Sequence, residues 1–321
     1  MGTILPNPRV SPRFAGLCTF GRYPRLEDVA PANRPVDWAV FGVPHDAGVT
    51  YRPGARFGPR AIREASQYLK RFHLEHAVDV CTVLSLADAG DAPVAPYSCK
   101  ENIAGVRTWA GGLADAGRTK LMALGGDHSI AYANIAATWD RLGRPAGGLA
   151  LIQFDSHLDT VPSVWGEEWG HASPFFRLIE DGIVDPKAML AVGVKGPLNV
   201  GTDLDYAKGK GVTIVPYSQW EREGDKAIRA FTAALKGRPT YITFDIDVVD
   251  PAYAPGTGTL SVGGFTSAQA LTLLRSLKGI NVAGGDVVEV LPDRDPTGIT
   301  AFLAAHIAFE ILALDAAAKA S

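Results

Sequence analysis

The feature that most constrains the fold of this chain is a regular alternation between short apolar runs and stretches of helical period. The apolar runs have the length of strands and contain few polar residues. Apolar strands separated by helices are typical of a parallel sheet that is covered on both faces. We therefore expect an α/β fold of three layers, αβα, around a central eight-stranded, mostly parallel sheet. The expected strands are residues 38–43, 80–86, 120–124, 149–154, 189–194, 212–215, 241–246 and 282–290.

The same pattern predicts the domain organisation. Residues 1–36 are rich in Pro and Arg and show no sustained period, so we interpret them as an N-terminal arm that packs on the surface or on a neighbouring subunit. Residues 37–321 contain no repeat, low-complexity tract or linker, and we interpret them as a single α/β domain. Helical periodicity is clearest at residues 59–71, 130–141, 225–235, 267–277 and 299–314.

Composition argues against several classes of protein. With 321 residues, 47% of them hydrophobic and 20% charged, the chain can bury a large core without cross-links. The net charge of -3 argues against a general nucleic-acid surface. The three cysteines lie far apart and none belongs to a CxxC pair, so we expect neither a disulfide scaffold nor a zinc ribbon.

Neither end of the chain carries a pattern typical of export or membrane insertion. Residues 1–14 lack the apolar centre of a signal peptide. The most apolar long segment, residues 299–314, is interrupted by His306 and Glu310, which indicates a buried helix rather than a membrane span. We expect a cytoplasmic protein that binds neither membranes nor nucleic acids.

One segment after an expected strand holds three candidate metal ligands. Asp155, His157 and Asp159 come directly after the apolar run at residues 149–154. Alternate residues of an extended backbone point to the same side, so these three side chains can converge while the two residues between them face away.

Two further strand ends show a similar pattern. Asp245 and Asp247 lie at the end of the run at residues 241–246 and are expected to share a face. The run at residues 120–124 is followed by two glycines and then His128, and glycines allow the sharp turn that brings His128 to the sheet edge. Because ligands bind outside the carboxyl ends of strands in open parallel sheets, we expect these segments to meet.

Together the three segments supply two imidazoles and four carboxylates. Clustered carboxylates repel one another strongly unless cations offset their charge. A set rich in oxygen and containing nitrogen suits a pair of divalent first-row ions, among which Mn²⁺ fits well. Such a pair generates hydroxide from water near neutral pH, which predicts a hydrolase that needs no organic cofactor.

These motifs resemble the three signatures of the ureohydrolases, the family of arginases, agmatinases and guanidino-acid hydrolases. They are GGDHS at residues 125–129, DSHLD at 155–159 and FDIDVVDPAYAPGTGT at 244–259. The last is most similar to the agmatinase branch, as are residues 42–48, 51–59, 286–290 and 298–301. The resemblance runs from about residue 37 to the C-terminus and implies an arginase/deacetylase-like fold.

The resemblance also implies a role for each metal ligand and two Mn²⁺ ions per chain, with Ni²⁺ or Co²⁺ as alternatives. One ion would be bound by His128 and Asp159, the other by His157 and Asp247, and both would be bridged by Asp155 and Asp245. Asp159 would in addition hydrogen-bond the attacking hydroxide, which makes it a catalytic residue as well as a ligand.

Two further residues match the catalytic machinery of the family. Glu289 matches the carboxylate that holds the substrate guanidinium, and His171 matches the histidine that passes a proton to the leaving amine. The reaction would release urea and a primary amine. We interpret the remaining histidines as structural, although His45 can line the site; they are His45, His73, His76 and His306.

The substrate tail is the open question. The loop after the second signature holds Glu167 and Glu168 beside two tryptophans, a combination that can receive the cationic amine of agmatine and so favours an agmatinase producing putrescine. Arg177, Lys195 and Asn199 can instead receive the carboxylate of a guanidino acid. The alternative is therefore a guanidinobutyrase or guanidinopropionase, and arginase is less favoured because residues 245–259 resemble agmatinases more closely.

Two departures from the family pattern leave every metal ligand in place. Leu158 replaces a small hydroxyl residue in the second signature, and Leu260 stands where agmatinases commonly have proline. Two alternatives are a different hydrolase on the same fold and a catalytically silent subunit of a hetero-oligomer. The complete ligand set argues against both. The resemblance implies a homotrimer or homohexamer.

Overall fold

The computed structural model describes residues 2–113 and 118–320, and its centre is a sheet of eight strands. The strands are β1 (Trp38–Val43), β4 (Leu86–Asp91), β5 (Lys120–Gly125), β6 (Leu149–Phe154), β7 (Val184–Val192), β8 (Thr213–Val215), β9 (Thr240–Asp245) and β10 (Val282–Val288). Every neighbouring pair in the sheet is parallel over the described ranges. The expected three-layer αβα fold with eight central strands is confirmed.

The last strand of the chain lies in the middle of the sheet. The strand order is β4-β1-β5-β10-β9-β6-β7-β8, so β10 pairs with β5 on one side and with β9 on the other. The first three strands in this order form one half of the sheet and the last four form the other, and β10 joins them. This order places β5, β10, β9 and β6 side by side, although β5 and β10 are far apart in the sequence.

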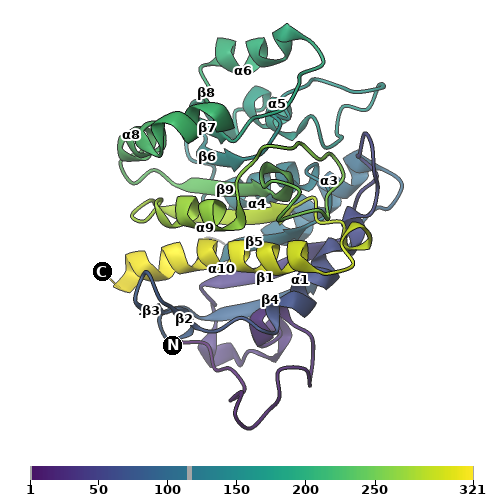
Figure 1. Cartoon of the computed structure of the whole chain (residues 1–321). Coiled ribbons are helices and arrows are strands. Elements are labelled where there is room, and N and C mark those ends of the chain that lie inside the picture. Colours follow the sequence, from purple (N-terminus) through teal and green to yellow (C-terminus); the bar gives the residue numbers. More distant parts are fainter. Residues whose placement is uncertain (1, 114–117, 321) are drawn as a thin grey trace.

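Alternate residues of each strand enter two separate cores. In β1, Trp38 and Val40 belong to one hydrophobic cluster, whereas Phe41 and Val43 belong to the other. The first cluster is covered by α1 (Gly58–Ser66), α8 (Lys226–Ala234), α9 (Ser267–Arg275) and α10 (Ile299–Ala320). The second is covered by α3 (Cys99–Gly111), α4 (Ile130–Arg141), α5 (Pro174–Glu180) and α6 (Asp205–Lys210). Figure 1 shows α9 and α10 crossing the near face of the sheet.

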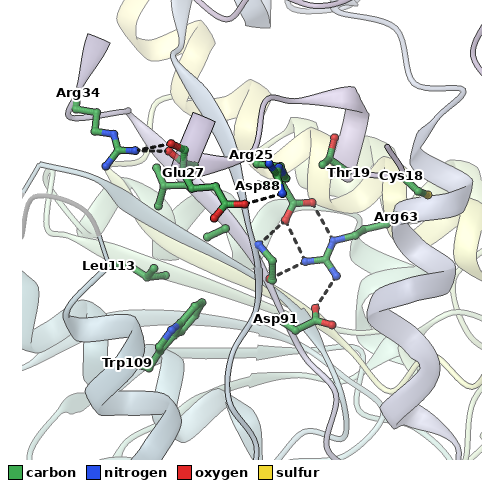
Figure 2. A pocket seen from close by; sticks show the side chains of 13 residues that line it. Cys18, Thr19, Arg25, Glu27, Arg34, Arg63, Asp88, Asp91, Trp109 and Leu113 are labelled. Atoms are coloured by element: carbon green, nitrogen blue, oxygen red, sulfur yellow. Dashed lines mark hydrogen bonds and ion pairs between the residues drawn. The ribbon is translucent and has the colours of Figure 1, made fainter. Parts of the chain in front are cut away.

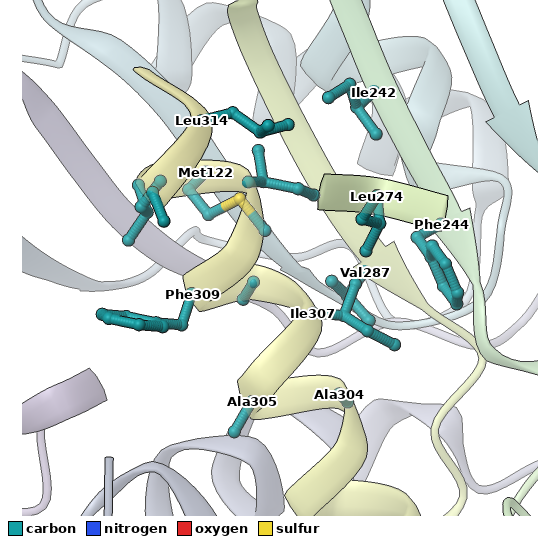
Figure 3. Close-up of a cluster of buried hydrophobic side chains, with 14 of the residues drawn as sticks. Met122, Ile242, Phe244, Leu274, Val287, Ala304, Ala305, Ile307, Phe309 and Leu314 are labelled. Atoms are coloured by element: carbon teal, nitrogen blue, oxygen red, sulfur yellow. The ribbon is translucent and has the colours of Figure 1, made fainter. Parts of the chain in front are cut away.

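Helix α10 is the main apolar element of the first core. Its Ile307 and Leu314 pack over the strand residues Met122 and Val287, together with Leu274 of α9 (Figure 3). By length and composition alone this helix could cross a membrane, and 83% of its most apolar stretch is buried inside the protein. Such burial is what a core helix of a three-layer fold requires.

The expected strand at residues 80–86 is wrong. Residues Val80–Val83 form a short helix, α2, and the strand β4 begins only at Leu86. The reason is a local cap, because the Asp79 side chain accepts a hydrogen bond of 3.1 Å from the backbone N–H of Thr82 and starts a helical turn. The short hairpin β2 (Phe72–His73) and β3 (Val78–Asp79) precedes α2, and α7 (Tyr217–Glu223) follows β8.

The N-terminal segment packs against β4, an edge strand of the sheet. Phe20 is fully buried, and its backbone N–H donates to Asp88 at 2.7 Å. Arg63 of α1 forms two hydrogen bonds with the same carboxylate, at 2.8 and 3.1 Å. Arg63 and Asp88 line a cavity beside the N-terminal segment (Figure 2), and its volume is about 660 Å³.

Candidate metal and catalytic site

The candidate ligands lie in segments that follow strands, but the backbone there is not extended as expected. β6 ends at Phe154, and Asp159 adopts a left-handed conformation with φ of 52°. Asp247 lies in a 3-10 turn, Ile246–Val248, rather than on a strand. Asp155 and Asp245 each accept the backbone N–H two residues ahead, at 2.7 and 2.8 Å, so local turns replace strand alternation in bringing the ligands together.

The first group of ligands surrounds His128. Its Nδ1 lies 3.1 Å from Asp155 Oδ2, 3.0 Å from Asp159 Oδ2 and 3.3 Å from Asp245 Oδ2. Nδ1 is buried and has no hydrogen-bond partner among the described residues, so it faces these oxygens without hydrogen-bonding geometry. Ligands about 2.1 Å from a common ion and at right angles stand about 3.0 Å apart, so these spacings fit a shared divalent ion.

The second group contains Asp155, His157 and Asp247. Nδ1 of His157 lies 3.1 Å from Asp247 Oδ2 and 3.5 Å from Asp155 Oδ1. Asp155 therefore belongs to both groups, with one oxygen toward each histidine. The structure brings all six sequence-predicted ligands together. The arrangement fits two ions that share a carboxylate, as the donor set of the sequence predicts.

A buried hydrogen-bond chain fixes the orientation of His128. Its Nε2 lies 2.9 Å from Thr243 Oγ1, and Thr243 donates to Asp286 at 2.6 Å. Tyr241 also donates to Asp286, at 2.9 Å. Because the Thr243 proton is given to Asp286, its oxygen accepts the proton of Nε2, which leaves the lone pair of Nδ1 directed at the carboxylates.

Hydrogen bonds to other polar residues hold the remaining ligands. Gln153, inside β6, donates to Asp155 Oδ2 at 2.8 Å and to the carbonyl of His157 at 3.1 Å. Thr259 donates to Asp247 Oδ2 at 3.1 Å. Leu158 is buried and belongs to the second hydrophobic core.

In the metal-free protein these close charges shift the ligands' pKa values strongly. Burial and the charges of Asp247 and Asp155 raise the pKa of Asp245 well above its ordinary value. Burial alone would lower the pKa of His128, but the carboxylates of Asp155, Asp159 and Asp245 outweigh it and raise that pKa. Protons bound in the site thus reduce the repulsion among its carboxylates, and two divalent cations would reduce the same repulsion.

His171 and Glu289 form a pair next to the ligands. His171 Nδ1 lies 2.8 Å from Glu289 Oε1, which also accepts the backbone N–H of His128 at 2.9 Å. The backbone N–H of Thr50 donates to His171 Nε2 at 3.0 Å. Glu289 has a left-handed backbone with φ of 63°, a conformation that costs a non-glycine residue about 1–3 kcal/mol and is common at functional sites.

The glycines before His128 act through close packing rather than through a left-handed turn. A Cβ on Gly126 would lie 2.2 Å from the carbonyl oxygen of His45, and one on Gly125 would lie 2.6 Å from the side chain of Val288. The absence of side chains lets the end of β5 approach its neighbours β1 and β10. Asp127, between Gly126 and His128, accepts the Gly48 N–H at 2.9 Å, and burial and Glu289 raise its pKa to about 7.

The residues considered for the substrate tail are mostly engaged elsewhere. Lys195 donates to Ser156 Oγ at 2.6 Å and to two backbone carbonyls. Arg177 donates to two carbonyls of the 160–170 loop and pairs with Glu168 at 3.3 Å. Glu167 uses one oxygen to accept the Trp169 N–H at 2.8 Å and forms no ion pair with a described residue.

Sequence reasoning missed the residues that support the ligands. Gln153, Thr243 and Asp286 are polar and fully buried within apolar strands, and Thr50 lies in a loop far from His171 in the sequence. An unpaired polar group in a strand core is costly, so a polar residue inside an apolar run is itself a signal of a specific partner. No sequence pattern linked Thr50 to the site.

Comparison with known proteins agrees with this geometry. The family model of the arginase family matches residues 36–314. The chain belongs to the arginase family. The arginase family consists of hydrolases that act on the C–N bonds of amidines, bind guanidino substrates and use a binuclear metal centre. The ureohydrolase resemblance drawn from the motifs is thus confirmed.

Arginase-family relatives of this chain differ in their named substrates. The chain is 38% identical to the proclavaminate amidinohydrolase of Streptomyces clavuligerus over 95% of both chains. A solved structure of that enzyme has a TM-score of 0.87 at 37% identity, over 96% of this chain and all of that one. A guanidinopropionase of Pseudomonas aeruginosa is 37% identical over 94% of this chain and 93% of its own. An agmatinase of Chromobacterium violaceum is also 37% identical, over 94% and 89%.

Proposed function

We propose that this protein hydrolyses agmatine to urea and putrescine with two divalent ions, Mn²⁺ before Ni²⁺ or Co²⁺. The observation that supports the metal pair is the position of Asp155, whose two oxygens face His128 and His157 separately. His128 and Asp159 would bind one ion, and His157 and Asp247 would bind the other. Asp155 and Asp245 would each contribute to binding both ions. Bound there, the ions would lower the pKa of water so that it can attack near neutral pH.

The chain's own residues would bind the guanidinium and move the proton. Oε1 of Glu289 is engaged by His128 and His171, whereas Oε2 has no hydrogen bond within the described residues and is free to accept guanidinium N–H groups. His171 would donate a proton from Nε2 to the leaving amine after that nitrogen leaves the Thr50 amide. Asp159 would accept a hydrogen bond from the attacking water.

Agmatine is favoured by the charges that remain available near this pair. Glu167 lies close in space to the residue that precedes His171, because its Cγ would be 3.6 Å from a Cβ on Gly170. Glu167 has no cationic partner in the described part of the chain, and a protonated amine would supply one. Arg177 and Lys195 already have several hydrogen bonds, which argues against a carboxylate tail bound by either.

A guanidino acid is the second candidate, and Arg52 favours it. The guanidinium of Arg52 stacks on Tyr51 at 4.8 Å and pairs with no carboxylate among the described residues. Its backbone carbonyl would lie 3.0 Å from a Cβ on Gly258, and the next residue, Thr259, bonds Asp247. A cation in this position can receive the carboxylate of 4-guanidinobutanoate or 3-guanidinopropanoate.

Urea release decides between the two tails. The Mn²⁺-loaded protein is assayed side by side on agmatine, 4-guanidinobutanoate, 3-guanidinopropanoate, arginine and free guanidine. We expect the highest kcat/KM for agmatine; a preference for either acid would support the Arg52 alternative, and a preference for arginine or guanidine would reject both tails.

A pair of variants tests the tail contact. Glu167→Gln should raise KM for agmatine with little change in kcat, because it removes a charge that binds the tail in ground and transition states alike. Glu168→Gln, whose carboxylate pairs with Arg177, is the matched control and should leave KM unchanged. Equal effects of the two variants would contradict a specific role for Glu167.

A further inference from the structure

A third cluster of metal-ligating side chains lies outside the site described above. His73 ends β2, His76 lies in the turn before β3, and Glu310 lies on α10. Each offers one ligand atom, and these atoms lie within 4.8 Å of one another. His73 and Glu310 are each only 3% exposed. The proposal for this cluster is independent of whether the substrate is agmatine or a guanidino acid.

Two buried nitrogens face the same side of the cluster. The rings of His73 and His76 stack with centroids 4.3 Å apart and planes at 19°. The backbone N–H of His76 donates to His73 Nδ1 at 3.1 Å, so the other ring nitrogen, Nε2, points at Glu310 Oε2, 2.7 Å away. Nε2 of His76 is buried and has no hydrogen-bond partner in the described part of the chain. An unpaired buried imidazole nitrogen is costly, and a metal ion would satisfy it.

The two carboxylate oxygens of Glu310 have different partners. Arg275 binds Oε1 with Nε at 2.9 Å and Nη2 at 2.6 Å, which fixes the carboxylate plane. Oε2 is left to face His73. Arg275 also reaches Glu75 at 3.0 Å, so the arginine charge is shared between two carboxylates and leaves net negative charge at the cluster. The cluster can therefore accept a divalent cation although Arg275 is close by.

A solvent route reaches the cluster. A cavity of about 210 Å³ is lined by His73, Glu310 and His306, and is open to the surface. His306 stands one turn before Glu310 on α10, and residues four apart share a helix face. The cavity thus connects two of the three candidate ligands, His73 and Glu310, with solvent.

We propose that His73, His76 and Glu310 bind a divalent first-row ion, for which Zn²⁺ is the best candidate. The bound ion would link the β2–β3 hairpin to α10. Two imidazoles and one carboxylate form a donor set that suits zinc, with water completing the shell. Binding through Nε2 of His73 moves the ring proton from Nε2 to Nδ1, which releases the His76 N–H from Nδ1, so the imidazole binds the ion in its neutral form and no proton is lost.

The stoichiometry of Zn²⁺ tests this site in the full-length protein. Protein freed of metal with a chelator is titrated with Zn²⁺, passed over a desalting column and analysed for zinc per chain. We expect three equivalents in the wild type and two in His76→Ala, which removes a proposed ligand at a partly exposed position. His306→Ala, which removes an exposed imidazole from the same cavity but not from the ligand set, should keep three. Asp247→Asn should lose an ion of the other site and keep this one.

Crystals grown with Zn²⁺ give a reading that does not depend on any variant. We expect an anomalous difference peak at the zinc edge between the two rings and Glu310. Wild-type protein that binds only two equivalents, or three with no peak at this position, would overturn the proposal. So would loss of the third equivalent in His306→Ala as readily as in His76→Ala. The cluster would then be a buried ion network of His73, Glu310 and Arg275 alone.

Discussion

His171 Nδ1 lies 2.8 Å from Glu289 Oε1 in a buried hydrogen bond. At its other nitrogen, Nε2, the ring faces both the backbone N–H of Thr50, at 3.0 Å, and the Thr50 hydroxyl, at 2.8 Å. Burial alone would lower the pKa of His171, but the charge of Glu289 outweighs it and raises that pKa to about 9. Nearby divalent ions would oppose this shift. The ring is therefore prepared to take up a second proton once Nε2 is released.

A first prediction concerns this pair. His171→Asn removes the proton donor, and we expect kcat to fall about 10²–10⁴-fold, the usual contribution of general acid catalysis. In Glu289→Gln the pKa of His171 should fall, which moves the alkaline limb of the kcat–pH profile to lower pH. Steady-state kinetics across pH measure both effects. His306→Asn, on the exposed side of α10, is the control, and a wild-type kcat in His171→Asn would contradict the assignment.

A second prediction concerns Asp286, which acts on the metal through Thr243 and His128. Asp286→Asn breaks the chain that fixes the His128 tautomer, and we expect divalent-metal affinity to fall about 10–100-fold, as for other groups behind a ligand. Isothermal titration with Mn²⁺ measures this directly. Asp315→Asn alters another buried carboxylate, which binds Trp38 and Lys120, and should leave affinity unchanged. Equal metal affinities in the two variants would show that Asp286 does not position His128 for metal binding.

A third prediction follows from the shared position of Asp155. Asp155→Ala removes an oxygen from both ligand groups, so we expect loss of the metal pair and of turnover. Asp245→Ala should behave in the same way. Metal content per chain and urea release are measured together, and full activity in either variant would refute the two-ion arrangement.

A fourth prediction concerns pH and the metal-free protein. The folded-state pKa values of Asp245, Asp159, His128 and His157 are all raised above their ordinary values. A raised pKa contributes stability at low pH that is lost as pH rises through the folded-state value. Their shared contribution therefore lowers the stability of the metal-free protein with increasing pH, and metal binding should raise Tm more at pH 8 than at pH 6.

Thermal denaturation with and without Mn²⁺ at both pH values checks this expectation. Asp155 has a lowered pKa and acts in the opposite direction, but at far lower pH. A stabilisation by metal that is equal at pH 6 and pH 8 would contradict the predicted coupling between protons and metal.

A fifth prediction concerns the contact between the N-terminal segment and the sheet edge. Asp88 accepts two hydrogen bonds from buried Arg63 and one from the Phe20 backbone, so Asp88→Ala leaves a buried guanidinium without its main partner. We expect a loss of about 3–5 kcal/mol in the free energy of unfolding. Urea denaturation measures it. Asp28→Ala, which breaks an exposed pair with Arg25, should leave the midpoint unchanged.

The sequence predicted most of the fold because buried parallel strands and helices have different periods. The helix at residues 130–141 is found with the expected bounds, and seven of the eight expected strands largely coincide with strands of the sheet, whereas the range 80–86 shares only Leu86 with β4. The run at residues 80–86 failed because its apolar residues gave no sign that Asp79 caps a helical turn. The strand that does lie there, β4, reads LADAGD and is too polar at its end to stand out.

That the candidate ligands lie close together could be predicted, because their residue types and their places after strands are both visible in the sequence. Their geometry could not be, since the turns at Asp155 and Asp245 and the left-handed Asp159 depend on local hydrogen bonds. The tail contacts were the hardest to predict. Whether a Lys195 or an Arg177 is free for a substrate depends on backbone carbonyls that only the folded chain supplies.

The central place of β10 determines when the site can exist during synthesis. β10 is the last strand to leave the ribosome, yet it separates β5, which positions His128, from β9 and β6, which position the carboxylates. A nascent chain that ends before residue 282 lacks the strand that joins these two groups of strands. We therefore expect the candidate ligands to come together only after β10 has been synthesised.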